Sequence, residues 1–298
     1  MRLDDLDPSR NTRDRGRGGG GGGGFRRGGL GGLIGLLPML LGRRMGLGTI
    51  IVIAIIGYFL FSSGGLQMGE VAPSGQAGQA TGTAQPCDTE AELFACRVLT
   101  STERTWTALF RQNGSQYAPP TLNFYQGGTR SGCGAAQASM GPFYCPADQG
   151  IYLDTNFFDQ MEREMGAGGD FAQAYVIAHE VGHHIQYLTG RAREVRTQQQ
   201  RVSSEAGNAL QVRMELEADC YAGVWAARNR DRMEPGDMEE GMRAANAIGD
   251  DTLQRQAQGY TVPESFTHGT SEQRMRWLRR GLETGDPAAC DTFSANRL

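Results

Sequence analysis

Apolar side chains recur with a helical period between Phe171 and Leu188. Asp170, followed by Gln173 three residues later, forms a capping-box pattern at the start of this stretch, and Gly190 is placed to end a helix in a left-handed conformation. The pattern therefore predicts one helix whose two boundaries are both marked. Spacings of three and four residues place the following side chains on one helical face: Phe171, Ala174, Ala178, Val181, Ile185 and Leu188.

Further elements are predicted on both sides of this helix. Residues 210–225 have apolar positions that broadly fit a second helix, and helices are expected to fill Asp170 to Glu283. Short strands are expected between Thr121 and Asp154, and residues 150–154, "GIYLD", are predicted to be one of them. These elements indicate an α+β domain, mainly helical around residues 171–188, with a small sheet.

One long apolar stretch lies outside this region. Leu47 to Phe61, "LGTIIVIAIIGYFLF", contains no charged residue and follows Arg43 and Arg44. A buried core helix would not be isolated between a glycine-rich segment and a linker, and a signal peptide rarely starts about 45 residues into a chain without a clear A-x-A site after it. We therefore predict an uncleaved transmembrane anchor at residues 46–62, at the short end of bilayer-spanning length.

Composition and charge separate the first 45 residues from the rest. Residues 1–45 carry nine Arg and four Asp, a net charge of +5, which leaves −9 for the remainder of a chain whose total is −4. Their tract at residues 15–29 is too rich in glycine to offset its ordering entropy, so a disordered arm is expected. With one Phe beside the arginines, no nucleic-acid partner is expected.

The arginines also predict topology and domain limits. Nine precede the apolar stretch and none occurs in the 35 residues after it, so the N-terminus is expected in the cytoplasm and the rest outside, in the periplasm or the extracellular space of a bacterium. Residues 63–86, rich in Gly, Ala, Gln and Ser, are predicted to be a flexible linker. The folded domain is expected to span residues 87–298.

All six cysteines follow the predicted anchor. An even number in an oxidising compartment is compatible with disulfides, and the local pairs Cys87–Cys96 and Cys133–Cys145 are favoured, although sequence does not define connectivity. A cysteine metal site is a weak alternative because no C-x-x-C pair occurs.

The predicted helix carries a candidate zinc motif. His179, Glu180 and His183 form H-E-x-x-H, in which the two imidazoles lie one turn apart and can reach one ion. Zn²⁺ suits imidazole ligands, needs an open position for catalysis and lowers the pKa of its bound water to about 7. Glu180, at the edge of that face, would then be the general base. Two histidines on a core helix by coincidence remain the alternative, so a third ligand is needed.

The third ligand is expected 32 residues further on. Glu215 and Asp219 lie four apart on the second helix, where Glu215 would complete a His₂Glu site and Asp219 would accept a hydrogen bond from a ligand histidine. Glu217 is the competing carboxylate, but it lies about 160° from Asp219 around a helix. A solvated acidic helix face is the alternative for these residues.

At this point the chain resembles the neutral zinc metallopeptidases, a family of membrane-anchored bacterial proteins. The E-x-x-x-D element also resembles the gluzincin peptidases, which implies a zincin-like domain, Glu215 as third zinc ligand and Asp219 as its outer partner. In similar peptidases an edge strand pairs with the substrate backbone, and residues 150–154 are the counterpart by analogy. The resemblance rests on the following segments: "TERTWTALF" (102–110), "GPFYCPADQGIYLD" (141–154), "AHEVGHHIQ" (178–186), "ELEADCYAGVW" (215–225) and "SFTHGTSEQRMRWL" (265–278).

Four further residues have open roles. His268, in a loop before a helix expected near Thr270, is a candidate to stabilise the oxyanion of the reaction, with a surface or structural histidine as the equal alternative. Tyr187 and Tyr260 are weaker candidates for the same task. His184 points about 100° away from His183, so packing is favoured over metal binding.

Together these residues favour a zinc-dependent endopeptidase, anchored in the membrane and acting on peptide or protein substrates. The alternative is an inactive zinc-binding scaffold or adaptor at the membrane. An intact Glu180 argues against the alternative, because a purely structural zinc site needs no base.

Overall fold

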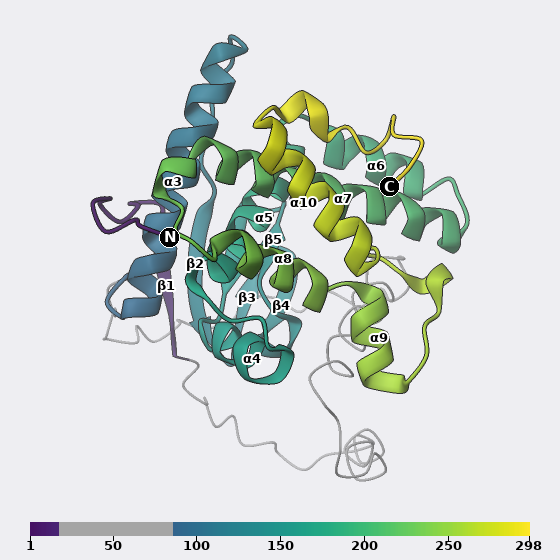
Figure 1. Ribbon diagram of the computed structural model, residues 1–298, viewed down its shortest axis with the longest axis horizontal. Helices are drawn as coiled ribbons and strands as arrows, with labels where there is room; N and C mark the ends of the chain where they lie inside the picture. Colours follow the sequence, from purple (N-terminus) through teal and green to yellow (C-terminus); the bar gives the residue numbers. More distant parts are fainter. Residues whose placement is uncertain (18–85) are drawn as a thin grey trace, which may run out of the picture.

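The apolar stripe at residues 171–188 forms helix α5 (Asp170–Leu188), which runs through the middle of the molecule (Figure 1). The structure is a computed structural model that describes residues 1–17 and 86–298. Helix α5 is buried along most of its length because it packs against α3 (Glu90–Gln112), α7 (Ser204–Arg228) and α8 (Asp237–Ala247). The other helices are α4 (Asn156–Met165), α6 (Arg191–Gln199), α9 (Asp250–Gln258) and α10 (Ser271–Thr284).

The predicted limits of α5 are confirmed at one end only. Gly190 follows the helix with φ of 84°, in the left-handed region. At the other end Gly169 is the N-cap, and no side chain of the segment caps the helix. The amide of Phe171 donates instead to the carboxylate of Glu240 on α8, at 3.1 Å. The predicted capping box at Asp170 is therefore wrong, since a carboxylate from a distant helix takes its place.

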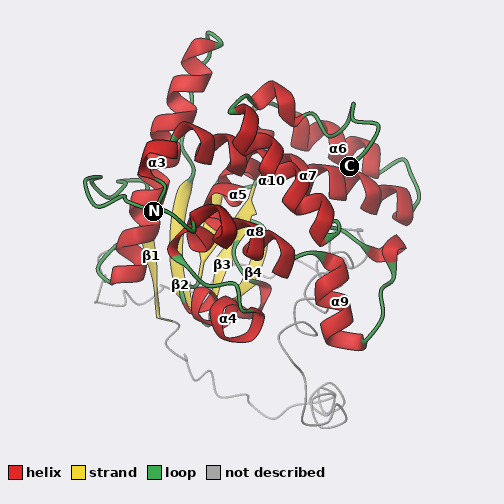
Figure 2. Cartoon of the chain, viewed as in Figure 1, coloured by secondary structure: helices red, strands yellow, loops and turns green. Residues whose placement is uncertain are grey.

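Helix α10 packs most extensively along α7 because both helices carry glycine at their contact. A Cβ atom at Gly223 would lie 2.2 Å from the carbonyl oxygen of Leu278, and one at Gly281 would lie 2.0 Å from that of Cys220. Real Cβ atoms do not approach other atoms this closely, so larger residues would push the helices apart. Helices α5, α7 and α10 form the helical layer beside the sheet (Figure 2).

The sheet has four strands in the order β1-β2-β6-β5, and a separate hairpin joins β3 and β4. β1 is parallel to β2 and β2 to β6, whereas β5 is antiparallel to β6. The strands β2 to β6 fall within the predicted region 121–154, which confirms an α+β fold. The strands are β1 (Thr12–Arg17), β2 (Thr121–Gln126), β3 (Gly128–Ser131), β4 (Gly134–Gln137), β5 (Phe143–Cys145) and β6 (Gly150–Leu153).

The edge strand suggested for residues 150–154 is a wrong prediction. β6 is buried at all four positions and is bonded on both sides, to β2 and to β5, so its backbone is not free to pair with a substrate. The edge next to β6 is β5, which contacts α5. Pairing partners are set by the order of strands in space, which a single strand's sequence does not contain.

Residues 1–17 belong to the folded domain, so the prediction of a disordered arm is wrong for them. β1 lies beside β2 and pairs with it (Figure 1). The side chains of Ser9 and Asn11 both donate to the carboxylate of Glu103 on α3. A backbone ladder and buried apolar side chains offset the entropy of ordering this segment, which the average composition of residues 1–45 does not reveal. The buried apolar side chains of the segment are Met1, Leu3 and Leu6.

The predicted anchor at residues 46–62, and all but the last residue of the predicted linker, lie outside the described residues. Among residues 1–17 and 86–298 there is no helix with the length and apolar character needed to cross a bilayer. The pairing of β1 with β2 nevertheless constrains topology, because two pieces of one fold must lie on the same side of any membrane. The expected placement of the N-terminus and the domain on opposite sides is inconsistent with this packing.

All six cysteines are paired in the structure. Cys87–Cys96 and Cys133–Cys145 are bridged, as predicted, and the third bridge joins Cys220 on α7 to Cys290 across 70 residues. The third pair was not assigned from sequence because its partners are brought together only by the packing of α7 against the C-terminal segment.

Candidate metal centre

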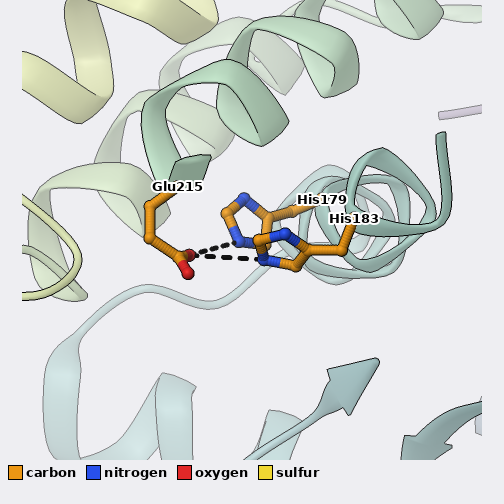
Figure 3. A group of neighbouring side chains, drawn as sticks. All are labelled: His179, His183 and Glu215. Carbon is orange, nitrogen blue, oxygen red and sulfur yellow. Dashed lines mark hydrogen bonds and ion pairs between the residues drawn. The ribbon is translucent and has the colours of Figure 1, made fainter. Parts of the chain in front are cut away.

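The structure brings together the three side chains that the sequence grouped as metal ligands. His179 and His183 project from α5 toward Glu215 on α7 (Figure 3). The Nε2 atoms of His179 and His183 lie 3.1 Å and 3.3 Å from Oε2 of Glu215. Ligand atoms placed tetrahedrally around zinc at 2.0–2.2 Å are separated by about 3.3–3.6 Å, so the two observed separations are close to those around one such ion.

A glycine on α5 allows this approach. A Cβ atom at Gly182 would lie 2.9 Å from the Cα atom of Ala218, so no side chain fits between the helices at this point. Gly182 lies between the two histidines of the motif, and Ala218 lies between Glu215 and Asp219. Helices α5 and α7 therefore pack tightly where their polar side chains meet.

His179 is held from behind by a buried charged group. Its Nδ1 lies 2.7 Å from Oδ1 of Asp219, which is 0 % exposed, and the Tyr175 hydroxyl donates to the same oxygen at 2.6 Å. Burial alone would raise the pKa of Asp219, but the Arg274 guanidinium and His179 outweigh burial and lower it to about 2. An ionised Asp219 accepts a hydrogen bond from the protonated Nδ1 of His179, which leaves the Nε2 lone pair facing Glu215.

Arg274 is a site residue that the sequence analysis missed. Its Nε and Nη2 atoms donate to the two oxygens of Asp219, both at 2.8 Å, and its side chain is 2 % exposed. It comes from α10, where Trp277 and Leu278 continue the same buried face. An arginine on the apolar face of a helix was a signal that could have identified it, because a buried guanidinium requires a buried partner.

His183 has a different support. Its Nδ1 lies 2.9 Å from Oε1 of Gln186, one turn further along α5. Glu217, the competing carboxylate of the sequence analysis, lies against Gln186 and Arg191 and not against the imidazoles. Glu215, in contrast, has its second oxygen hydrogen-bonded by the Gln211 amide at 2.8 Å.

Glu180 is buried beside the two histidines, with 7 % of its surface exposed. Burial raises the pKa of Glu180, and the nearby positive charges on His183 and His179 oppose this only in part. A carboxyl group whose pKa is shifted toward neutrality can both take and return a proton near pH 7. This is the property that a general base in a hydrolase requires.

His268 lies in the loop between α9 and α10, and Asp250 fixes that loop. One oxygen of Asp250 accepts the backbone N–H groups of Thr267, His268 and Gly269, at 2.7, 2.6 and 3.1 Å. Burial would lower the pKa of His268, but the charge of Glu215 and the contact with Asp250 outweigh burial and raise it. His268 is therefore near the ligand cluster, and Asp250 is a supporting residue that no sequence pattern marked.

The three weaker candidates are two exposed tyrosines and one buried histidine. Tyr187 and Tyr260 are 39 % and 62 % exposed. His184 is fully buried, where its ring nitrogens lie 2.9 Å from the Tyr144 hydroxyl and 2.6 Å from the carbonyl oxygen of Ala118. Both nitrogens of His184 are thus occupied, which leaves none to bind a metal and agrees with a packing role.

Comparison with known proteins identifies the family. The model of the family described as "Putative neutral zinc metallopeptidase" matches residues 1–293. The chain is 50 % identical to the uncharacterized protein YpfJ of Escherichia coli K12 over 250 residues, which cover 83 % of this chain and 86 % of that protein. It is 42 % identical to the uncharacterized protein Rv2575 of Mycobacterium tuberculosis H37Rv over 216 residues, or 68 % and 72 % of the two chains. No solved structure is significantly similar. The chain therefore belongs to this family of neutral zinc metallopeptidases.

Proposed function

We propose that this protein is a zinc-dependent endopeptidase that hydrolyses peptide bonds in peptide or protein substrates. The observation that carries the proposal is the convergence of His179, His183 and Glu215 at the separation that tetrahedral zinc needs, with Glu180 buried beside them. Zinc held by these ligands would supply a Lewis acid that polarises the scissile carbonyl and activates water.

Glu180 would move the proton of the reaction. It takes a proton from the attacking water as the C–O bond forms, and it returns that proton to the amine nitrogen as the C–N bond breaks. Burial raises the pKa of Glu180 above the usual range of a glutamate, which favours proton uptake from water. A purely structural zinc site has no use for this residue, which favours turnover over a scaffold role.

His268 would stabilise the oxyanion that forms on the scissile carbonyl. The Asp250 carboxylate holds the loop that carries it, and His268 lies near Glu215 on the side of α10. A donor that is positioned before the reaction stabilises developing charge more effectively than mobile water does.

The test of the proposed activity is Glu180→Gln, with Glu164→Gln at an exposed position of helix α4 as the matched control. Proteolysis of a peptide library should fall by about 10²–10⁴-fold in Glu180→Gln, while zinc content stays near one ion per chain. The control should match the unaltered protein in both measurements. Equal proteolysis in Glu180→Gln and the control would refute the role of Glu180, and a zinc-loaded protein without any proteolysis would favour the scaffold.

We propose further that the protein is attached to the bacterial cytoplasmic membrane through the apolar stretch 47–61, with its folded domain on the exported side. The three disulfides support export, because such bonds persist in oxidising compartments. Since β1 pairs with β2, residues 1–17 and 86–298 would share that side, so the proposed attachment is not a single crossing of the bilayer.

Single cysteines test this arrangement, because every native cysteine is bridged. Arg10→Cys reports on the N-terminal segment and Ser115→Cys on the loop after α3, and both positions are exposed. An impermeant maleimide should label both in intact cells. Labelling of Arg10→Cys only after lysis would overturn the shared side, and a requirement for lysis in both variants would overturn export.

A further inference from the structure

Gln186 occupies a position between a candidate metal ligand and a buried carboxylate. Its Oε1 lies 2.9 Å from Nδ1 of His183, and its Nε2 donates to the carbonyl oxygen of Met214 at 2.7 Å and to Oε2 of Glu217 at 2.9 Å. Gln186 is 0 % exposed and Glu217 is 1 % exposed, so water does not compete for these contacts.

The two acceptors determine which way the amide of Gln186 points. The carbonyl oxygen of Met214 can only accept a hydrogen bond, so it requires the NH₂ group of Gln186. The ionised carboxylate of Glu217 accepts from the same NH₂ group. The opposite orientation would place Oε1 against two acceptors and leave buried groups unpaired, which costs about 1–3 kcal/mol for each group. Met214 and Glu217 on α7 therefore hold Oε1 of Gln186 toward His183.

The orientation of Gln186 in turn selects the proton position on His183. Oε1 only accepts hydrogen bonds, so Nδ1 of His183 must carry a hydrogen to bond with it. In the neutral imidazole the lone pair is then on Nε2, which lies 3.3 Å from Oε2 of Glu215 within the ligand cluster. A metal ligand is oriented in this way by the partner of its other ring nitrogen.

We infer that Gln186 is a positioning residue that sets the tautomer and orientation of His183, and that Glu217 acts on His183 through Gln186. This inference rests on the proposed zinc site but not on turnover. It assigns a function to the carboxylate at 217, which the pattern E-L-E-A-D left without one.

The test is the affinity for zinc, measured by competition with a chromophoric chelator in the full-length protein. Gln186→Met keeps the length of the side chain but removes the acceptor, and should raise the Kd for zinc by about 10–100-fold. Gln198→Met, at an exposed position on α6, is the matched control and should leave the Kd within about twofold. Unchanged zinc affinity in folded Gln186→Met would overturn the inference.

Two variants of Glu217 test the same chain of contacts without altering α5. Glu217→Gln keeps an oxygen that accepts from Gln186 and should bind zinc as the unaltered protein does. Glu217→Met removes that acceptor and should raise the Kd by a smaller factor than Gln186→Met, because Met214 still accepts from the amide. These variants decide the question if Gln186→Met does not fold, and equal affinity in both would overturn the role of Glu217.

A spectroscopic measurement separates positioning from a general loss of structure. In zinc-loaded protein labelled with ¹⁵N at histidine, His183 should show a protonated Nδ1, and this signal should broaden or vanish in Gln186→Met while that of His179 persists. Loss of both signals would indicate a general structural defect and contradict the inference. If zinc affinity depends on Gln186 but the unaltered protein shows no proteolysis, the inference about Gln186 stands and only the proposed activity is refuted.

Discussion

His179 and His183 lie one turn apart on α5, yet the groups behind their Nδ1 atoms differ in charge and in origin. Behind His179 are Asp219 and Arg274, an ion pair from α7 and α10. Behind His183 is Gln186, a neutral amide from α5 itself. The two rings also differ in exposure, with 8 % of the side chain exposed at His179 and 18 % at His183.

This difference shows that the two histidines of one motif depend on different parts of the fold. The support of His179 requires three helices to pack correctly, because its charged partners are buried and cannot be left unpaired. The first contact of His183 is made within a helix at a spacing of three residues, and only the orientation of the amide depends on α7. Substitution of the groups behind His179 should therefore lower the free energy of unfolding more than substitution of the group behind His183.

Arg274→Met removes the ion pair behind His179 and should have the largest effect on stability. It leaves the Asp219 carboxylate buried without its bidentate partner, and loss of one member of a buried ion pair costs about 3–5 kcal/mol. Urea denaturation should show a lower free energy of unfolding by that amount. Arg279→Met, at an exposed position on the same helix, should change it by less than about 0.5 kcal/mol. Similar stability of the two variants would contradict the claim that the support of His179 depends on a buried ion pair.

The second prediction concerns pH. Burial would lower the pKa of His183, but the Glu215 carboxylate outweighs burial and raises the pKa to about 10. Zinc binds the neutral imidazole, so protons compete with zinc at every pH below that value, and affinity must fall as pH falls. The Kd for zinc should rise by at least about tenfold for each pH unit between pH 9 and pH 7. A Kd that stays constant over this range would show that His183 is already neutral.

Tyr175→Phe is expected to have the smallest effect, because it removes one neutral donor from Asp219 and leaves Arg274 and His179 in place. A hydrogen bond to a charged group contributes about 1.5–3 kcal/mol, and the remaining donors of Asp219 reduce the loss toward the lower figure. Thermal or urea unfolding would measure it, with Tyr187→Phe at the exposed end of α5 as control. A loss as large as that of Arg274→Met would mean that the hydroxyl, and not the ion pair, holds Asp219.

Local patterns predicted the parts of the molecule that depend on local spacing. The stripe from Phe171 to Leu188, the left-handed Gly190 and the two short-range disulfides all follow from residues close together in the chain. Glu215 could be grouped with the histidines because four-residue spacing on a helix restricts where its carboxylate points.

The wrong predictions involve partners that are distant in sequence. Glu240 replaces the local cap of α5, β2 covers one side of β6, and β1 brings residues 12–17 into the sheet. Composition averaged over residues 1–45 concealed the last of these, because the glycine tract and the buried N-terminal segment were counted together. The pairing of Cys220 with Cys290 was open for the same reason.

By itself, the sequence grouped the candidate metal ligands of this protein and marked the turns of α5 that present two of them. The tertiary structure decided what holds those side chains in place, because Arg274, Glu217 and Asp250 act on the site from other helices. Helical period relates residues within a few turns, whereas the pairing of buried charges and amides is resolved only when the helices pack and exclude water.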